Sequence, residues 1–135
     1  MTDGEPDATA SLHEMVPFAG TLGIEMLSSA PSEVRGRLAW AESLCTVGGA
    51  LNGGAIMALA DNTGGLCAFL NLPAGAGSTS TIESKTNFLR AVRDGHATAT
   101  SRPMHVGRRF VVVETEVHDD AGRLVAKVTQ TQAVL

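Results

Sequence analysis

The segment 46–70 differs from the rest of the chain because nearly all of its positions are apolar or small. Its sequence is TVGGALNGGAIMALADNTGGLCAFL, and a helix that is apolar nearly all round is usually buried. We predict a helix over residues 53–71, with Asn52 as its N-cap and the Pro/Gly-rich stretch 73–77 after its end. Asp61 is the single acid in this segment, and Asp is rarely buried without a partner.

Outside this helix, apolar and polar residues tend to alternate with a period of two, which indicates strands. Two strand segments precede the helix and four follow it: 23–30, 33–40, 78–89, 95–103, 109–118 and 123–134. The first two and the last two are predicted to form hairpins. This order predicts an α+β fold, in which one long helix packs against a roughly six-stranded, mostly antiparallel sheet.

Small residues form a stripe along one side of the predicted helix, and Asp61 lies in that stripe. An interior glycine costs a helix roughly 1 kcal/mol relative to alanine, so the pair Gly64-Gly65 implies a compensating contact. We expect the close approach of another backbone there. The face that carries Asp61 is therefore predicted to be a contact face, towards a second subunit.

The first 15 residues are mostly small and polar, which predicts a disordered or loosely attached tail. Residues 16–135 have the length of a single domain. No apolar run is long enough to cross a bilayer, and the acidic N-terminus lacks the pattern of a signal peptide. We therefore expect a cytoplasmic protein that does not enter a membrane.

The charge balance argues against a nucleic-acid-binding protein, because 10 Lys and Arg stand against 14 Asp and Glu, for a net charge of −4. Two cysteines, Cys45 and Cys67, do not make a disulfide framework. The four histidines are scattered, and no Cys/His cluster offers a metal site. We expect neither a metal nor a cofactor.

Asp61 is the first candidate for chemistry. No Lys or Arg lies within four residues of it, so the helix offers it no local ion pair. A carboxylate that is buried without a cation is suited to act as a general base or nucleophile. The alternative is an ordinary helix acid that faces water, and the residues alone leave both open.

Gly53 and Gly54, at the start of the helix, are the second candidate. Bare amides at a helix N-terminus can hold a developing oxyanion, although glycines also occur in plain tight turns. Asp61 lies about 10 Å from Gly54 by helix rise. One reacting carbon cannot contact both within one chain, so we expect a two-fold dimer that joins the Asp61 of one chain to the Gly54 of the other.

The run Asn52-Gly53-Gly54 followed by MALAD resembles the HGGxxxxLaD signature of the hotdog-fold acyl-CoA thioesterases of the phenylacetate-pathway (PaaI-like) group. The resemblance continues in TNFLRAVRDGHATA and in VGRRFVVVETEVHDDAGRLVAKVTQT, and it covers about residues 18–134. It implies a hotdog fold, in which an antiparallel sheet wraps a long central helix. It also implies a homodimer, often a dimer of dimers, with active sites at the subunit interface and acyl-CoA as substrate.

The same resemblance implies roles for five catalytic positions. Asp61 matches the catalytic acid, a nucleophile or a general base, and the Gly54 amide matches the donor that polarises the thioester carbonyl. Thr81 matches a hydroxyl that orients the water or the acid. Asn52 replaces the usual His, and Thr46 replaces the usual Asn or Gln; both positions help to hold the thioester.

Further residues are implied as contacts to the substrate. The positions that would contact CoA or the acyl group are Gly53, Arg90, Arg108 and Arg109. For the arginines, the alternative is a solvated surface. Thr79 is a less favoured substitute for Thr81. Trp40 and Phe88 could line an acyl pocket, but core packing is the role that we expect for both.

The function implied is hydrolysis of an acyl-CoA thioester to a free acid and CoA, with no cofactor. An alternative class is a non-catalytic acyl-CoA- or lipid-binding hotdog protein, which the departures at Asn52 and Thr46 motivate. A hotdog dehydratase is less favoured, because those enzymes pair a His with an acid and the predicted helix contains no His. The acyl group stays open, as does an acyl carrier protein as the donor.

Overall fold

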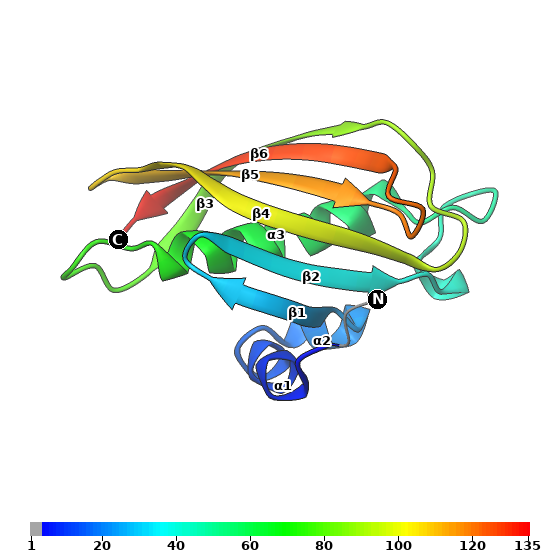
Figure 1. Ribbon diagram of the computed structural model, residues 1–135, viewed down its shortest axis with the longest axis horizontal. Coiled ribbons are helices and arrows are strands. Elements are labelled where there is room, and N and C mark those ends of the chain that lie inside the picture. The colour runs from blue at the N-terminus through cyan, green and yellow to red at the C-terminus, as the bar shows by residue number, and fades with distance from the viewer. Residues whose placement is uncertain (1–3) are drawn as a thin grey trace.

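An antiparallel sheet curves around one long helix in the computed structural model, which describes residues 4–135 (Figure 1). The elements follow the chain as α1 (Pro6–Met15), α2 (Pro17–Leu22), β1 (Glu25–Ala30), β2 (Glu33–Ala39), the 3-10 helix η1 (Glu42–Leu44), α3 (Gly53–Leu70), β3 (Thr79–Phe88), β4 (His96–Val106), β5 (Phe110–His118) and β6 (Leu124–Val134). The predicted α+β class, with two strands, a long helix and four further strands, is confirmed.

The six strands form one antiparallel sheet in the order β1-β2-β4-β5-β6-β3. The predicted hairpins β1–β2 and β5–β6 are both present. β3 follows α3 along the chain and pairs with β6 at one edge of the sheet. β1 occupies the other edge, where α1 packs against it, and α2 contacts α1 and α3 (Figure 1).

The core lies between α3 and the concave face of the sheet, where alternate strand residues point at the helix. Gly36 on β2 lets the helix come close, because a Cβ there would lie 2.9 Å from Thr63 Cγ2. Buried hydroxyls join the sheet to the helix, since Ser101 Oγ lies 2.9 Å from Thr63 Oγ1 and 2.7 Å from Thr115 Oγ1. Hydrogen bonds satisfy these polar groups inside the core.

Within the single chain, α3 is buried on one side and not all round, so of the two readings of Asp61 left open by the sequence, the structure of one chain shows an acid on the exposed side. Asp61 is exposed, whereas Gly64 on the inward side is buried. Gly64 does make a close contact, but with a side chain and not with another backbone, because an added Cβ would overlap Gln130 Oε1. A Cβ added at Gly65 would instead meet free space.

The N-terminal segment is a helix and not the loosely attached tail predicted for residues 1–15. In α1, Leu12 is buried in the core. Thr9 Oγ1 accepts a hydrogen bond from the Met26 amide at 2.9 Å, which fastens α1 to β1. The prediction failed because the segment is mostly polar and the helix makes only a few apolar contacts. Of the predicted tail, residues 1–3 lie outside the described part of the chain.

β3 is the most exposed strand of the sheet, since none of its residues is buried. Ile82 and Phe88 on this strand are 59% and 49% exposed. An edge strand that exposes apolar side chains and unpaired backbone groups is a surface to which another strand can add. The exposed side of α3 lies next to it, because Thr81 on β3 contacts Asp61.

Candidate active site

Asp61 lies on the exposed side of α3, beside β3. Thr81 Oγ1 donates a long hydrogen bond to Asp61 Oδ1, at 3.4 Å. Thr81 Oγ1 in turn accepts a hydrogen bond from Gln132 Nε2 on β6, at 2.6 Å. The structure therefore brings together the acid and the hydroxyl that the sequence singled out, and it adds a third side chain from the last strand.

An apolar cavity of about 330 Å³ opens beside Asp61 and Thr81. Its apolar wall comes from α1, α3 and the residue between α1 and α2: Leu12, Met15, Val16, Leu66 and Phe69. Gly65 also lines the cavity, and its lack of a side chain leaves the space open. A cavity with an apolar wall and a few convergent polar groups is typical of a small-molecule site.

A second group of the predicted residues lies at the N-terminus of α3. Asn52 is the N-cap, as predicted, and its Oδ1 accepts a hydrogen bond from the Gly54 amide at 2.7 Å. The Gly54 amide, expected to polarise a carbonyl, is thus already engaged. Asn52 and Gly54 line a cavity of about 250 Å³ together with residues of α2 and η1. The Asn52 amide can present its Nδ2 protons there, because its oxygen faces the helix.

The loop before α3 is held by side chains from other segments. Trp40 Nε1 donates to the Gly49 carbonyl at 2.9 Å, and Arg93 donates to the Gly48 carbonyl at 2.7 Å. Thr46 lies at the start of this loop and is exposed. Its amide donates to the Ala50 carbonyl at 2.8 Å, so its backbone closes the loop. The side chain of Thr46 lines neither of the two cavities described above.

The two groups of residues do not meet within one chain. Asp61 and Thr81 line one cavity, and Asn52 and Gly54 line another. Asp61 lies seven positions after Gly54 in α3, which is about 10 Å along the helix axis. Within the described chain, each cavity therefore contains one part of the predicted set of catalytic residues.

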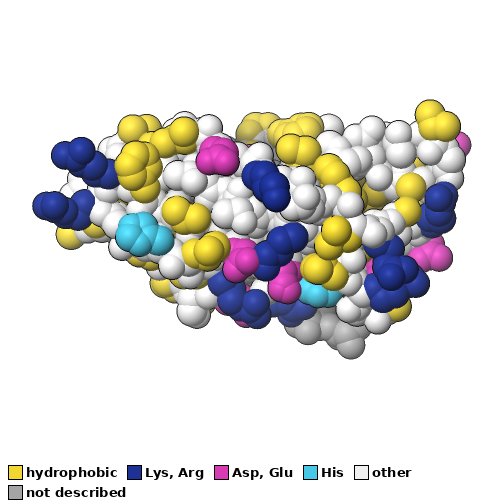
Figure 2. All heavy atoms as spheres, turned by 90° about the horizontal axis from the view of Figure 1, so that it is seen from above, with side chains coloured by type: hydrophobic (Ala, Val, Ile, Leu, Met, Phe, Trp, Pro, Cys, Tyr) yellow, Lys and Arg dark blue, Asp and Glu magenta, His cyan; other side chains and the backbone are white. Residues whose placement is uncertain are grey.

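The three predicted phosphate-binding arginines are exposed at opposite ends of the molecule. Arg108 and Arg109 lie in the β4–β5 turn, whereas Arg90 follows β3. Figure 2 shows basic side chains at both ends of the long axis, and the left end is that of the β4–β5 turn in Figure 1. None of the three lines the Asp61 cavity.

Phe88 is half-exposed, so the expectation that it packs in the core is wrong. Its ring packs on Gly53, where an added Cβ would lie 3.0 Å from Phe88 Cζ. Gly53, Phe88 and Arg90 line a surface cavity of about 510 Å³. Trp40 is partly buried and packs against the core, as expected.

The remaining reactive groups do not form an alternative centre. Burial raises the pKa of the Cys67 thiol to about 11, which makes it a poor nucleophile at neutral pH. Among residues 4–135, no group of three or more His, Cys, Asp or Glu is placed to hold a metal ion. No helix within this range is long and apolar enough to span a bilayer.

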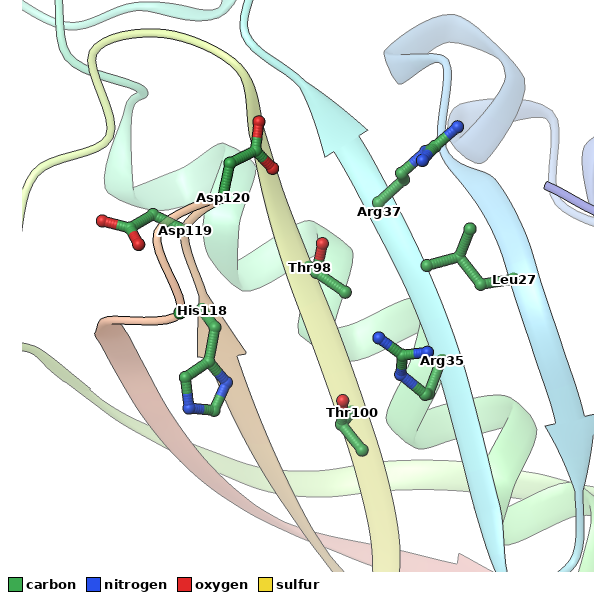
Figure 3. A pocket seen from close by; sticks show the side chains of 9 residues that line it. Leu27, Arg35, Arg37, Thr98, Thr100, His118, Asp119 and Asp120 are labelled. Carbon is green, nitrogen blue, oxygen red and sulfur yellow. The ribbon is translucent and has the colours of Figure 1, made fainter. Parts of the chain in front are cut away.

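A larger cavity, about 630 Å³, lies on the face of the sheet that points away from α3 (Figure 3). Arg35 and Arg37 on β2 and the β5–β6 turn contribute its charges. Arg37 pairs with Glu25 at 3.3 Å. Hydrogen bonding to the Arg123 amide is the main cause that lowers the pKa of Asp119 in that turn. Because Asp119 is held by the Arg123 side chain and by backbone amides, the size of this cavity alone does not identify it as a reactive site.

Two parts of the Asp61 site were missed in the sequence. Gln132 could have been found, because it occupies a buried position of β6 in phase with Val128. α1 could have been found from Ala8 and Leu12, which lie four residues apart and both pack against the core. No sequence pattern indicates that these two elements meet at Asp61, because they lie at opposite ends of the chain.

Comparison with known proteins places this fold and these residues in a family. A model described as the Thioesterase superfamily matches residues 48–126, which include α3 with Asp61 and strands β3 to β5. A candidate esterase of Mycobacterium tuberculosis strain H37Rv is 31% identical over 124 residues, which are 90% of this chain and 89% of that protein. The 1,4-dihydroxy-2-naphthoyl-CoA hydrolase of Escherichia coli K12 is 32% identical over 87 residues, 64% of this chain and 63% of the hydrolase.

Solved structures agree with these sequence matches. A thioesterase from Haemophilus influenzae has a TM-score of 0.86 at 25% identity, covering 94% of this chain and 90% of its own. The structure of the Mycobacterium tuberculosis protein has a TM-score of 0.85 at 28% identity, covering 89% of this chain and 97% of its own. The expected hotdog fold is confirmed, and the chain belongs to the thioesterase superfamily.

Proposed function

We propose that the protein hydrolyses an acyl-CoA thioester to a free acid and CoA, with Asp61 delivering the attack. The observation that carries the proposal is the Asp61–Thr81 contact at the polar end of an apolar cavity. A hydroxyl beside a carboxylate at the end of an apolar cavity suits an apolar acyl group whose carbonyl lies next to Asp61. Family membership supports the same class of reaction.

Asp61 can act in either of two ways. As a general base, its carboxylate takes a proton from water while the water oxygen bonds to the thioester carbonyl carbon. As a nucleophile, its own oxygen forms that bond, and water then hydrolyses the resulting anhydride. In both cases the carbon–sulfur bond breaks and the electron pair leaves with sulfur. A thiol pKa of about 8.5 makes the thiolate an acceptable leaving group without prior protonation.

The carbonyl oxygen becomes negative during the attack and needs a donor. Gly54 offers its backbone amide at the positive end of α3, although Asn52 Oδ1 now accepts that proton. We infer that one of two donors serves: the Gly54 amide after rotation of the Asn52 side chain, or Asn52 Nδ2 while the cap stays in place. The exposed position of Thr46 suits a contact to the bound thioester rather than a part in the attack.

A two-fold dimer would complete the site. Asp61 and Gly54 are too far apart to reach one carbon in a single chain, whereas a two-fold axis beside α3 would bring the Asp61 of one protomer to the Gly54 of its partner. The exposed edge strand β3, with Ile82 and Phe88, suits strand addition between two protomers. Pairs of such dimers are the expected larger assembly.

The acyl group would lie in the Asp61 cavity, against α1. Met15 and Phe69 in its wall are both apolar and exposed, which favours an uncharged aromatic or aliphatic acyl group. Arg90, Arg108 and Arg109 would bind the CoA phosphates, because the guanidinium group matches phosphate geometry. Arg90 lies beside Gly53, at the helix end that would hold the carbonyl.

The test is Asp61→Asn, which keeps the size of the side chain and removes its charge. We expect kcat for a panel of acyl-CoA thioesters to fall by about 10²–10⁴-fold, the usual effect of losing a general acid–base group. CoA release is followed with a thiol-reactive dye. Asp94→Asn is the matched control, since Asp94 is an exposed acid outside the Asp61 cavity. Full activity of Asp61→Asn would contradict the proposal.

A second candidate is binding of acyl-CoA without hydrolysis. The engaged Gly54 amide favours it, because a capped amide cannot polarise a carbonyl. Calorimetry separates the two functions: tight binding of an acyl-CoA with no thiol release would support a binding protein. Thiol release that depends on Asp61 would exclude it.

A further inference from the structure

Two glutamines on β6, Gln130 and Gln132, point at α3 and are 0% and 1% exposed. A buried side-chain amide normally has hydrogen-bond partners. The amide of Gln130 has none among the described residues. Gln132 contacts two threonines of β3, one of which is Thr81. The two glutamines are equally buried but differ in their hydrogen bonds, which indicates that they have different roles.

Gln132 determines where the Thr81 proton points. A hydroxyl has one proton to donate and two lone pairs that accept. Because Gln132 Nε2 donates to Thr81 Oγ1 at 2.6 Å, the Thr81 proton is left for Asp61 Oδ1. If the amide were turned by 180°, Gln132 Oε1 would accept that proton, and Thr81 could no longer donate to Asp61.

Thr79 also contacts the Gln132 amide. Its Oγ1 is the donor to the Ala133 carbonyl oxygen at 2.9 Å and lies 3.2 Å from Gln132 Oε1, so its one proton is shared between two acceptors and the carbonyl is the nearer one. The orientation of the amide therefore rests on the shorter hydrogen bond from Nε2 to Thr81 Oγ1, at 2.6 Å. Gln132 is almost inaccessible to water, so solvent does not compete for these hydrogen bonds.

We propose that Gln132 is a positioning residue for Asp61, acting through Thr81; the proposal rests on thioester hydrolysis at Asp61. A Thr81 proton on Asp61 Oδ1 fixes the rotation of the carboxylate and leaves Oδ2 for water or the thioester. Loss of the Gln132 amide lets Thr81 rotate. The chemical step then slows while substrate binding is kept, so kcat falls and KM changes little.

The test compares Gln132→Met with Gln130→Met, which replace buried glutamines on the same face of β6 by an apolar chain of similar length. We expect kcat of Gln132→Met to fall about tenfold, with KM changed less than about twofold. Gln130→Met keeps its kcat, because Gln130 has no side-chain hydrogen bond to lose. Equal losses in both variants, or none in Gln132→Met, would overturn the proposal.

The route through Thr81 is tested in a Thr81→Val background. Residues that act through one group are not additive, so Gln132→Met should reduce kcat no further once the Thr81 hydroxyl is gone. A second tenfold loss in the double variant would show that Gln132 acts by another route, and the proposal would fall.

A readout without substrate is the Thr81 rotamer, from three-bond NMR couplings. We expect one rotamer in the wild type and in Gln130→Met, and averaged couplings in Gln132→Met. If Gln132→Met does not fold, Gln132→Leu replaces it, since it also removes the amide that donates to Thr81. Unchanged Thr81 couplings would overturn the positioning role. An active Asp61→Asn would contradict the proposed function instead.

Discussion

The two halves of the candidate site are held in different ways. At the start of α3, Asn52 caps Gly54, a contact between residues two apart in the sequence. In the middle of α3, Asp61 accepts a hydrogen bond from Thr81 of β3, and Thr81 accepts one from Gln132 of β6. The first half is local, whereas the second requires two strands that lie far apart in the sequence. The local half can form as soon as the helix does, whereas the other forms only when β3 and β6 have paired.

This difference also separates two kinds of functional group. A backbone amide at a helix terminus has a fixed direction, so one neighbouring side chain is enough to occupy or release it. A carboxylate on an exposed helix face can rotate freely, and fixed partners are needed to direct it. Asp61, the side chain that we propose to be reactive, therefore lies where tertiary contacts can orient it.

Mixing inactive protomers tests whether the two halves come from different chains, and it has the largest expected effect. Asp61→Asn damages one half-site and Asn52→Asp the other. If each site combines Asp61 of one protomer with Asn52 of its partner, half of the randomly mixed dimers carry one intact site. Activity should then recover to about a quarter of the wild-type value.

The controls are each variant unfolded and refolded alone, which should stay inactive. Sites contained in one chain would give no recovery on mixing, because every site would keep one defect. That outcome would remove the dimer from the proposed mechanism. Analytical ultracentrifugation of the mixed sample checks that dimers have formed.

Two substitutions of Asn52 separate its capping role from a role as donor. Asn52→Asp keeps an oxygen for the Gly54 amide but removes the Nδ2 protons, so the cap survives. If Asn52 Nδ2 is the donor, kcat falls by about 10²-fold or more. Asn52→Ala frees the Gly54 amide and costs about 1 kcal/mol of stability. Activity kept in Asn52→Ala and lost in Asn52→Asp would assign the carbonyl to Gly54.

Met15→Trp tests whether α1 bounds the acyl group. The larger side chain narrows the Asp61 cavity, so kcat/KM for the longest accepted acyl-CoA should fall by about tenfold or more relative to the shortest. Glu14→Trp is the control, because Glu14 is exposed on the same helix and does not line the cavity. Equal effects of Met15→Trp on all chain lengths would place the acyl group elsewhere.

Alanine substitutions at the adjacent glycines of α3 have the smallest expected effect, which is on stability. They also form the most closely matched pair of variants. Gly64→Ala would collide with Gln130 and should lower the free energy of unfolding by about 1–3 kcal/mol. Gly65→Ala meets free space within the chain and should raise it by up to about 1 kcal/mol. Denaturant unfolding measures both. Destabilisation by Gly65→Ala would instead indicate that a partner backbone lies against this glycine in solution.

Much of the fold could be predicted, because its periodicities are clear. The alternation of β2 and β5 and the apolar run of α3 correctly predicted these elements within a few residues. α1 was missed because its apolar residues are few and lie in a polar segment. The burial of α3 was overestimated, since an apolar composition does not say which side a single chain covers.

The sequence by itself determined the N-cap at Asn52, the six strands and the presence of an acid in the helix, because each depends on a local pattern or on residue type. Only the tertiary structure decided what surrounds that acid. Gln132 and Met15 reach the Asp61 cavity from the two ends of the chain. Their meeting depends on strand order and on the docking of α1. Such contacts join residues far apart in the sequence, and no local periodicity encodes them.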